Sequence, residues 1–311
     1  MAGIKEWSDY ELSLPGNAAC GGCPSTMALR TVGKALGENA VMIMTPSCAV
    51  ASIGLLPKSA YDIPTLNICF AGAGVSASAV VNAFEIAHEK GRFEGEVPTV
   101  FNWTGDGGTY DIGLQSLSAA AERNDNILHF CYNNEAYSNT GIQRSGATMQ
   151  FAQTTTTPGG KPNPKKNLAQ IMLEHRVPYV ATASIADLQD LYRKVEKAKA
   201  IQGFKYIEIH APCFTAWKFA AADTVEIARL AVKSGAWLLW EANEDVITFQ
   251  GATKQIAEGK KEPEALEEYL SAQGRFNKLL KSPDREENLA QLKADLAREL
   301  ALIKHRAAFK G

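Results

Sequence analysis

The sequence predicts an α/β fold with a doubly wound, mostly parallel sheet. Six short apolar runs, rich in β-branched and aromatic residues, alternate with helical stretches. The chain has 311 residues, of which 46% are hydrophobic and 21% charged, enough to build a large core. Strand–helix alternation of this kind is typical of parallel sheets, whose ligands bind beyond the carboxyl ends of the strands.

The elements follow one another along the chain in a regular order. Buried strands are predicted at residues 40–45, 65–70, 97–103, 127–132, 178–183 and 205–211. Helices are predicted at residues 76–90, 112–123, 186–200 and 224–234, the last with Asp223 as its N-cap. A final helix, 283–304, carries a leucine-rich stripe that we expect to pack on the chain's own core.

Segment 154–166 interrupts this alternation of strands and helices, because it is polar and rich in proline and glycine. A plain surface loop and a functional lid or partner-docking loop are both compatible with such a composition.

Charge and hydropathy exclude several classes of protein. The net charge of −2 gives no basic surplus for nucleic acid or an anionic membrane. The N-terminus MAGIKEWSDYELS has no apolar run, and no stretch approaches the roughly 20 apolar residues of a membrane span. We therefore expect a cytoplasmic protein whose six cysteines are reduced.

The cysteines fall into two groups by context. Cys69 and Cys131 lie inside apolar strand runs and are predicted to belong to the core. The other four stand in loops or just after strands: Cys20, Cys23, Cys48 and Cys213. Four convergent thiolates fit a structural zinc or a [4Fe–4S] cluster, and one close pair with two distant single cysteines modestly favours the cluster. A redox-active Cys-x-x-Cys pair remains the alternative.

A second motif follows the third predicted strand, in VFNWTGDGGTYDIG. Asp106 lies between Gly105 and Gly107, and the next strand ends in CYNNEAYSNTG. Asp106, the side chain of Asn134 and the carbonyl of Ala136 form an all-oxygen set suited to Mg²⁺. Magnesium in turn holds a diphosphate, which glycines allow the backbone to approach. The alternative is a turn in which Asp106 only caps the following helix.

A third motif, CFAGAGVSA, superficially matches a dinucleotide fingerprint through Gly72, Gly74 and Ala77. Such a fingerprint usually opens a domain, whereas this one lies in mid-chain, so we expect its glycines to serve close packing or cofactor approach. The alternative interpretation, that the protein is a NAD-dependent oxidoreductase, rests on this motif alone.

Taken together, CGGC, the GDG…NNEAYSNTG pair, TTTTP and HAPC resemble the β subunit of the 2-oxoacid:ferredoxin oxidoreductases, pyruvate:ferredoxin oxidoreductase above all. The resemblance extends from about residue 16 to residue 276. It implies a single thiamine diphosphate-binding domain over residues 1–311, with a cluster-binding segment within 1–50 and a C-terminal helix within 280–311.

The resemblance also implies the ligands. Cys20, Cys23, Cys48 and Cys213 would hold one [4Fe–4S] cluster, and Asp106, Asn134 and the carbonyl of Ala136 would hold Mg²⁺. Gly105, Gly107 and Ser138 would border the cofactor, and Asn139 would lie near its thiazolium and the substrate. The implied reaction is the oxidative decarboxylation of a small 2-oxoacid, with electrons passed to ferredoxin. A zinc-stapled, non-catalytic scaffold with the same fold is the other alternative.

Several positions depart from the family pattern around the cysteines: Pro24, Pro46, Ser47 and Phe214–Ala216. These changes leave the predicted ligands intact and bear on the substrate, for which pyruvate is the first expectation and oxalate the second. Oxalate has a second carboxylate, and Arg144 is a candidate cation for it.

Partner chains are expected for two reasons. The resemblance implies an α-type subunit that carries the pyrimidine-type thiamine domain and an activating glutamate. One cluster accepts one electron at a time, and two cysteines remain after four are used, so further clusters should sit on a ferredoxin-like subunit that leads to ferredoxin.

Overall fold

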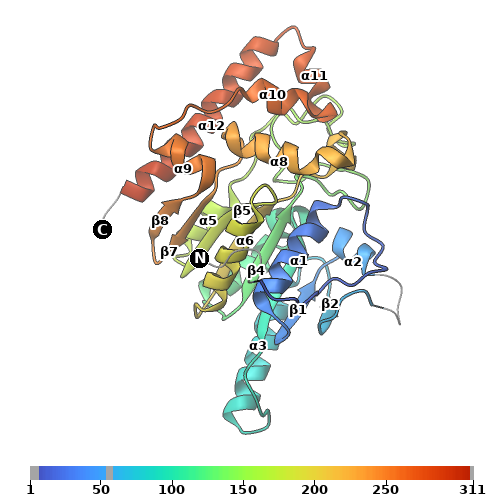
Figure 1. Cartoon of the computed structure of the whole chain (residues 1–311), viewed down its shortest axis with the longest axis vertical. Helices are drawn as coiled ribbons and strands as arrows, with labels where there is room; N and C mark the ends of the chain where they lie inside the picture. The colour runs from blue at the N-terminus through green and yellow to red at the C-terminus, as the bar shows by residue number, and fades with distance from the viewer. Residues whose placement is uncertain (1–6, 54–58, 309–311) are drawn as a thin grey trace.

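The computed structural model describes residues 7–53 and 59–308. Residues 1–6 of the predicted N-terminal segment and 309–311 of the predicted C-terminal segment lie outside the described residues. One eight-stranded sheet runs through the chain in the order β2-β1-β3-β4-β6-β5-β7-β8 (Figure 1). Its strands are β1 Ala40–Met44, β2 Thr65–Asn67, β3 Thr99–Gly105, β4 Leu128–Asn133, β5 Tyr179–Ser184, β6 Lys205–His210, β7 Trp240–Asn243 and β8 Val246–Phe249.

Strands β1 to β6 are parallel, and each lies on a predicted run, so the prediction of a mostly parallel sheet is confirmed. The hairpin of β7 and β8 adds an antiparallel edge that the sequence analysis did not predict. Strand β2 ends at Asn67, short of its predicted end, and the chain turns at residues 69–72. Cys69 is therefore exposed, and its assignment to the core was wrong, whereas Cys131 is fully buried.

Helices cover both faces of the sheet, as expected for a doubly wound fold. The chain before β6 contributes α1 Pro24–Leu36, α2 Cys48–Ser52, α3 Ala73–Glu89, α4 Leu114–Glu122, α5 Leu168–Glu174 and α6 Leu188–Lys199. The chain after β6 contributes α7 Phe214–Trp217, α8 Thr224–Lys233, α9 Gly251–Ala257, α10 Leu266–Ser271, α11 Asn277–Leu280 and α12 Arg285–Ala308.

Two core layers result from alternation along the strands. Phe101 and Phe130 point into the layer beneath α1 and α6, and Val100 and Ile127 into the layer beneath α3, α4 and α5. A third cluster lies under the C-terminal helices, at the top of Figure 1, and α12 buries Leu289 and Leu292 there. Packing of this helix on the chain's own core is thus confirmed.

Two smaller expectations also have outcomes. Asp223 does occupy the N-cap position of α8, but its side chain makes no capping hydrogen bond. No helix within residues 7–53 and 59–308 is both long enough and apolar enough to cross a membrane.

Gly74 of CFAGAGVSA serves helix packing. Gly74, near the start of α3, lies so close to α4 that a Cβ atom there would meet the carbonyl oxygen of Ser116 at 2.2 Å. We expect Gly74→Ala to lower the free energy of unfolding by about 1–3 kcal/mol, because two helix backbones would have to separate. Denaturant unfolding measures this change.

Gly159→Ala is the matched control, because a Cβ at that loop position would meet nothing within 4 Å. We expect it to change the free energy of unfolding by less than about 0.5 kcal/mol. Equal effects of the two substitutions would contradict the close approach of α3 to α4.

Candidate functional site

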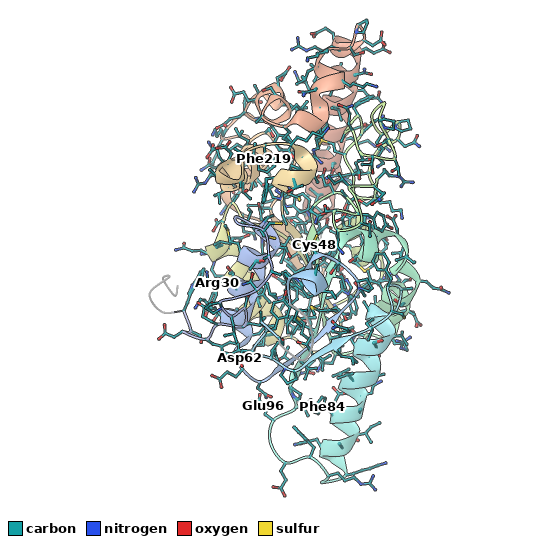
Figure 2. The ribbon with its side chains drawn as sticks, turned by 90° about the vertical axis from the view of Figure 1, so that its right-hand side faces the viewer. Arg30, Cys48, Asp62, Phe84, Glu96 and Phe219 are labelled. Atoms are coloured by element: carbon teal, nitrogen blue, oxygen red, sulfur yellow. The ribbon has the colours of Figure 1, made fainter. Side chains whose placement is uncertain are left out.

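Four strands that are consecutive in the sheet, β1, β3, β4 and β6, end at a common edge. Cys48, Asp106, Asn134 and Cys213 each follow one of these strands within four residues. Because the strands are parallel, their carboxyl ends meet there, which brings together side chains as far apart in sequence as 165 positions (213 − 48). Figure 2 shows Cys48 near the middle of the molecule, well away from Phe84 on the projecting part of α3.

Asp106 is completely buried at this edge. Its Oδ2 accepts a hydrogen bond from Ser145 Oγ at 2.5 Å, and its Oδ1 accepts one from the backbone N–H of Asn134 at 3.4 Å. Its side chain does not cap the π-helical turn Gly107–Asp111 that follows, so the alternative of a simple helix cap does not describe it. Burial raises the pKa of this carboxyl to about 8, which means that an ionised Asp106 requires a positive partner.

Asn134 supplies the most informative geometry. One terminal atom of its amide lies 3.0 Å from Asp106 Oδ1, 2.8 Å from the carbonyl oxygen of Ala136 and 3.0 Å from Ser138 Oγ. With the amide nitrogen there, its two N–H groups are within hydrogen-bonding distance of these three acceptors and close the loop without a metal. With the amide oxygen there, it accepts a hydrogen bond from Ser138 Oγ but faces the oxygens of Asp106 and Ala136, an arrangement that a bound cation would stabilise. Adjacent ligands of an octahedral Mg²⁺ lie about 2.9 Å apart, so the spacing fits this ion.

A cavity of about 150 Å³ opens beside these groups. All seven residues predicted to bind the cofactor line it: Gly105, Asp106, Gly107, Asn134, Ala136, Ser138 and Asn139. Cys48 lines it too, which puts one candidate cluster ligand against the candidate cofactor site. Phe70 and Tyr137 form an aromatic wall, with their rings edge to face at 6.0 Å between centroids.

Gly107 makes room for this wall. A Cβ atom on Gly107 would lie 2.4 Å from the ring of Tyr137, whose hydroxyl donates to the Gly107 carbonyl at 3.2 Å. Arg144, in contrast, does not line the 150 Å³ cavity. It lines a neighbouring cavity of about 550 Å³ together with Lys161 and Lys166, and Tyr137 borders both cavities. Its predicted contact with the substrate stays a prediction.

The four candidate cluster ligands come from three segments. Cys23 precedes α1, Cys48 is the first residue of α2, and Cys213 precedes α7, so each segment places a cysteine at a helix N-terminus, where backbone N–H groups favour negative charge. Burial raises the pKa of the Cys48 thiol to about 12, and the thiols of Cys213, Cys23 and Cys20 add to this shift. The four sulfurs are thus close enough to repel one another as thiolates.

The four cysteine side chains do not form a ready ligand set. Among residues 7–53 and 59–308, no three His, Cys, Asp or Glu side chains are arranged to hold a metal ion. Cys20 is exposed and the other three are half-buried, so without a metal the thiols can remain protonated. A metal would stabilise the four thiolates together, so the chemistry of the residues fits a bound cluster or zinc.

Three residues of the site were missed by the sequence analysis. Ser145 holds Asp106, Trp217 donates its indole N–H to the carbonyl oxygen of Asn134 at 2.8 Å, and Arg275 forms a buried ion pair with Glu135 at 2.7 Å. The sequence around these three residues gives no indication of their roles, because each contact joins segments that are 39 to 140 positions apart.

Comparisons with known proteins agree with this geometry. Residues 69–209 match the family described as thiamine pyrophosphate enzyme, C-terminal TPP binding domain. This range contains Asp106, Asn134 and the whole lining of the 150 Å³ cavity from Phe70 onward.

Two curated relatives cover most of the chain. It is 44% identical over 276 residues to the pyruvate synthase subunit PorB of Methanothermobacter marburgensis, covering 87% of this chain and 91% of that protein. It is 40% identical over 271 residues to the ketoisovalerate oxidoreductase subunit VorB of Pyrococcus abyssi, covering 86% of this chain and 85% of that one.

A solved structure shares the fold. It is the 2-oxoglutarate:ferredoxin oxidoreductase from Magnetococcus marinus with 2-oxoglutarate, coenzyme A and succinyl-CoA bound, at a TM-score of 0.54, 20% identity and coverage of 72% of this chain and 79% of that chain. Since the relatives named above are oxidoreductase subunits at 40% identity or more over nearly their full length, a non-catalytic scaffold is excluded. The chain that gathers Asp106, Asn134 and four cysteines at one sheet edge belongs to the β subunits of the 2-oxoacid:ferredoxin oxidoreductases.

Proposed function

We propose that this chain binds thiamine diphosphate, Mg²⁺ and one [4Fe–4S] cluster within a single domain and catalyses, with partner subunits, the oxidative decarboxylation of pyruvate. The observation that carries the proposal is the convergence of Asp106, Asn134 and the Ala136 carbonyl beside a cavity. The names of the relatives, pyruvate synthase and ketoisovalerate oxidoreductase subunits, support a 2-oxoacid as substrate. Electrons would leave through a ferredoxin-like subunit to ferredoxin.

The residues of the chain have separate tasks in this proposal. When bound, thiamine diphosphate supplies the electron sink for cleavage of the bond between the 2-oxo carbon and the carboxylate. Asp106, Asn134 and the Ala136 carbonyl would hold Mg²⁺ and so orient the diphosphate. Asn139, which is exposed on the cavity wall, would hydrogen-bond an oxygen of the substrate as charge develops on it. Phe70 and Tyr137 would exclude water.

The cysteines that line or adjoin the cavity would hold the cluster. Because Cys48 lines the cofactor cavity, a cluster on it would lie near enough to accept electrons from the reacting centre. The ligand set is Cys20, Cys23, Cys48 and Cys213.

Iron analysis tests this ligand set. In the isolated chain reconstituted with iron and sulfide, we expect serine at any one of the four positions to remove most of the iron and sulfide, because a thiolate ligand is lost. Serine at Cys69 should leave the iron content unchanged, because this residue is exposed in a turn. Serine at Cys131, which is fully buried, should leave iron unchanged at a packing cost of order 1–3 kcal/mol.

Loss of iron in the Cys69 or Cys131 variant, with iron retained in one of the four, would overturn the assignment. Zinc bound in place of iron would be recognised as easily, because the protein would be colourless.

Turnover of the purified complex tests the substrate. Pyruvate, 2-oxobutyrate, 2-oxoglutarate and oxalate are compared by reduction of a viologen dye, and we expect pyruvate to be turned over fastest. Oxalate is the second candidate, because Arg144, which lines the neighbouring cavity, would be a cation for its second carboxylate. Turnover of oxalate alone, lost in Arg144→Ala, would replace pyruvate by oxalate.

A further inference from the structure

Trp217 joins the two segments that carry the proposed metal ligands. Its indole N–H donates to the carbonyl oxygen of Asn134 at 2.8 Å, and its backbone N–H donates to the carbonyl oxygen of Cys213 at 2.8 Å. The side chain is 1% exposed. One residue therefore contacts both the metal loop, which we define as residues 133–138, and the segment of the fourth cysteine, residues 210–217.

Arg275 clamps Trp217 from the other side. Its guanidinium carbon lies 3.5 Å from the centroid of the Trp217 ring, and its Nη1 forms an ion pair with Glu135 Oε2 at 2.7 Å. Both charged side chains are 2% exposed, and Arg275 Nε donates to Gln273 Oε1 at 2.8 Å. Arg275 thus supports the metal loop in two ways: it packs on Trp217, which bonds Asn134, and it forms the ion pair with Glu135.

The metal loop needs such support because its backbone is in an unfavourable conformation. Glu135 has a φ of +57°, in the left-handed region that residues other than glycine rarely adopt. This conformation turns the chain between Asn134 and Ala136, so that the side chain of one and the carbonyl of the other face the same point. Strained backbone of this kind persists only where its surroundings hold it.

We propose that Trp217, clamped by Arg275, is a positioning residue that holds the metal loop in the conformation that binds Mg²⁺ and fixes it to the segment of Cys213. The inference rests on the proposed function, because it presumes the magnesium site. It adds a role for the C-terminal part of the chain, since Arg275 belongs to the short helix Gly274–Phe276 outside the sheet.

The test is Trp217→Phe in the co-expressed complex. Phenylalanine keeps a ring against Arg275 but removes the N–H, which leaves the buried carbonyl of Asn134 without its donor. We expect the Mg²⁺ concentration that half-saturates thiamine diphosphate binding to rise about tenfold, which calorimetry measures. A role in packing alone would lower the melting temperature without moving this concentration.

Trp237→Phe is the matched control. Trp237 is 5% exposed and stacks on His210 at 4.7 Å, on the same buried cluster, but its indole N–H has no partner in the described part of the chain. The same change of ring therefore removes no hydrogen bond to the metal loop. We expect it to leave the Mg²⁺ requirement unchanged.

Equal Mg²⁺ requirements in the wild type and Trp217→Phe would overturn the inference, as would equal increases in both tryptophan variants. If Trp217→Phe does not assemble, Arg275→Lys, which keeps a positive charge beside Glu135 but removes the planar stack, is measured instead, with the same expected increase. Asp106→Ala separates this inference from the proposed function. If it too binds Mg²⁺ and cofactor normally, the magnesium site itself is wrong; if it fails while Trp217→Phe binds normally, only the positioning role is wrong.

Discussion

Asp106→Ala is expected to abolish Mg²⁺-dependent binding of thiamine diphosphate while the chain still folds and assembles. Asp106 is the charged member of the converging oxygen set and is completely buried. Loss of a carboxylate ligand from a magnesium–diphosphate pair should cost several kcal/mol, because the anion loses its bridge to the protein. Calorimetric titration of the co-expressed complex with the cofactor and Mg²⁺ measures the effect.

Asp125→Ala is a suitable control, since Asp125 is largely buried too, but it bonds Arg123 and Ser78 in the turn between α4 and β4, outside the cavity. We expect its cofactor affinity to match the wild type. The fold should survive in Asp106→Ala, because burial already raises the pKa of this carboxyl to about 8. For a carboxyl with a raised pKa, burial of the ionised form costs stability increasingly as pH rises from about 4 to about 8, so removal of the group relieves this cost. Near-normal cofactor affinity in Asp106→Ala would end the assignment.

The parallel part of the sheet was predictable because its strands are buried on both faces. Strands β3 and β4 therefore appear in the sequence as runs dominated by apolar and aromatic residues, whereas β6 alternates apolar residues with the buried Lys205, Glu208 and His210. The edge strand β2 misled the prediction, because its apolar run continues into a turn and only three residues pair with β1. Cys69 was placed in the core for that reason.

The candidate ligands were predictable because each directly follows a strand or stands in a motif. Their supports were not, because Ser145, Trp217 and Arg275 act through contacts between distant segments. The left-handed conformation of Glu135 was also hidden, since glutamate gives no sign of it in sequence. The sequence thus predicted which residues gather at the edge, whereas the interactions that hold them there required the structure.

The isolated chain is expected to be inactive, with activity only in a complex. The chain belongs to a family whose named members are subunits, so other subunits complete the enzyme. The size of the cavity indicates that part of its wall is missing. At about 150 Å³ the cavity is smaller than typical small-molecule sites, which have roughly 300–1,000 Å³. A second wall from a partner would enclose the cofactor and supply the acid that activates its aminopyrimidine ring.

Exposed apolar residues support the same interpretation. Leu66 in the edge strand β2, Val75 in the first turn of α3 and Ile112 just before α4 are 45%, 55% and 51% exposed. Large exposed apolar side chains are typical of a protein–protein interface. We expect the partner that completes the site to cover them.

Electron transfer gives a further reason for inactivity. Oxidation of a 2-oxoacid releases two electrons, whereas a [4Fe–4S] cluster accepts one at a time, and only Cys69 and Cys131 remain beyond the four proposed ligands. To test the prediction, the chain is expressed alone, reconstituted with thiamine diphosphate, Mg²⁺, iron and sulfide, and assayed for viologen reduction with pyruvate and with oxalate. We expect a rate at least about a hundredfold below that of the co-expressed complex, since loss of a catalytic acid alone costs about 10²–10⁴-fold. A rate near that of the complex would mean that the chain supplies its own activating acid and that the half-site interpretation of the cavity is wrong.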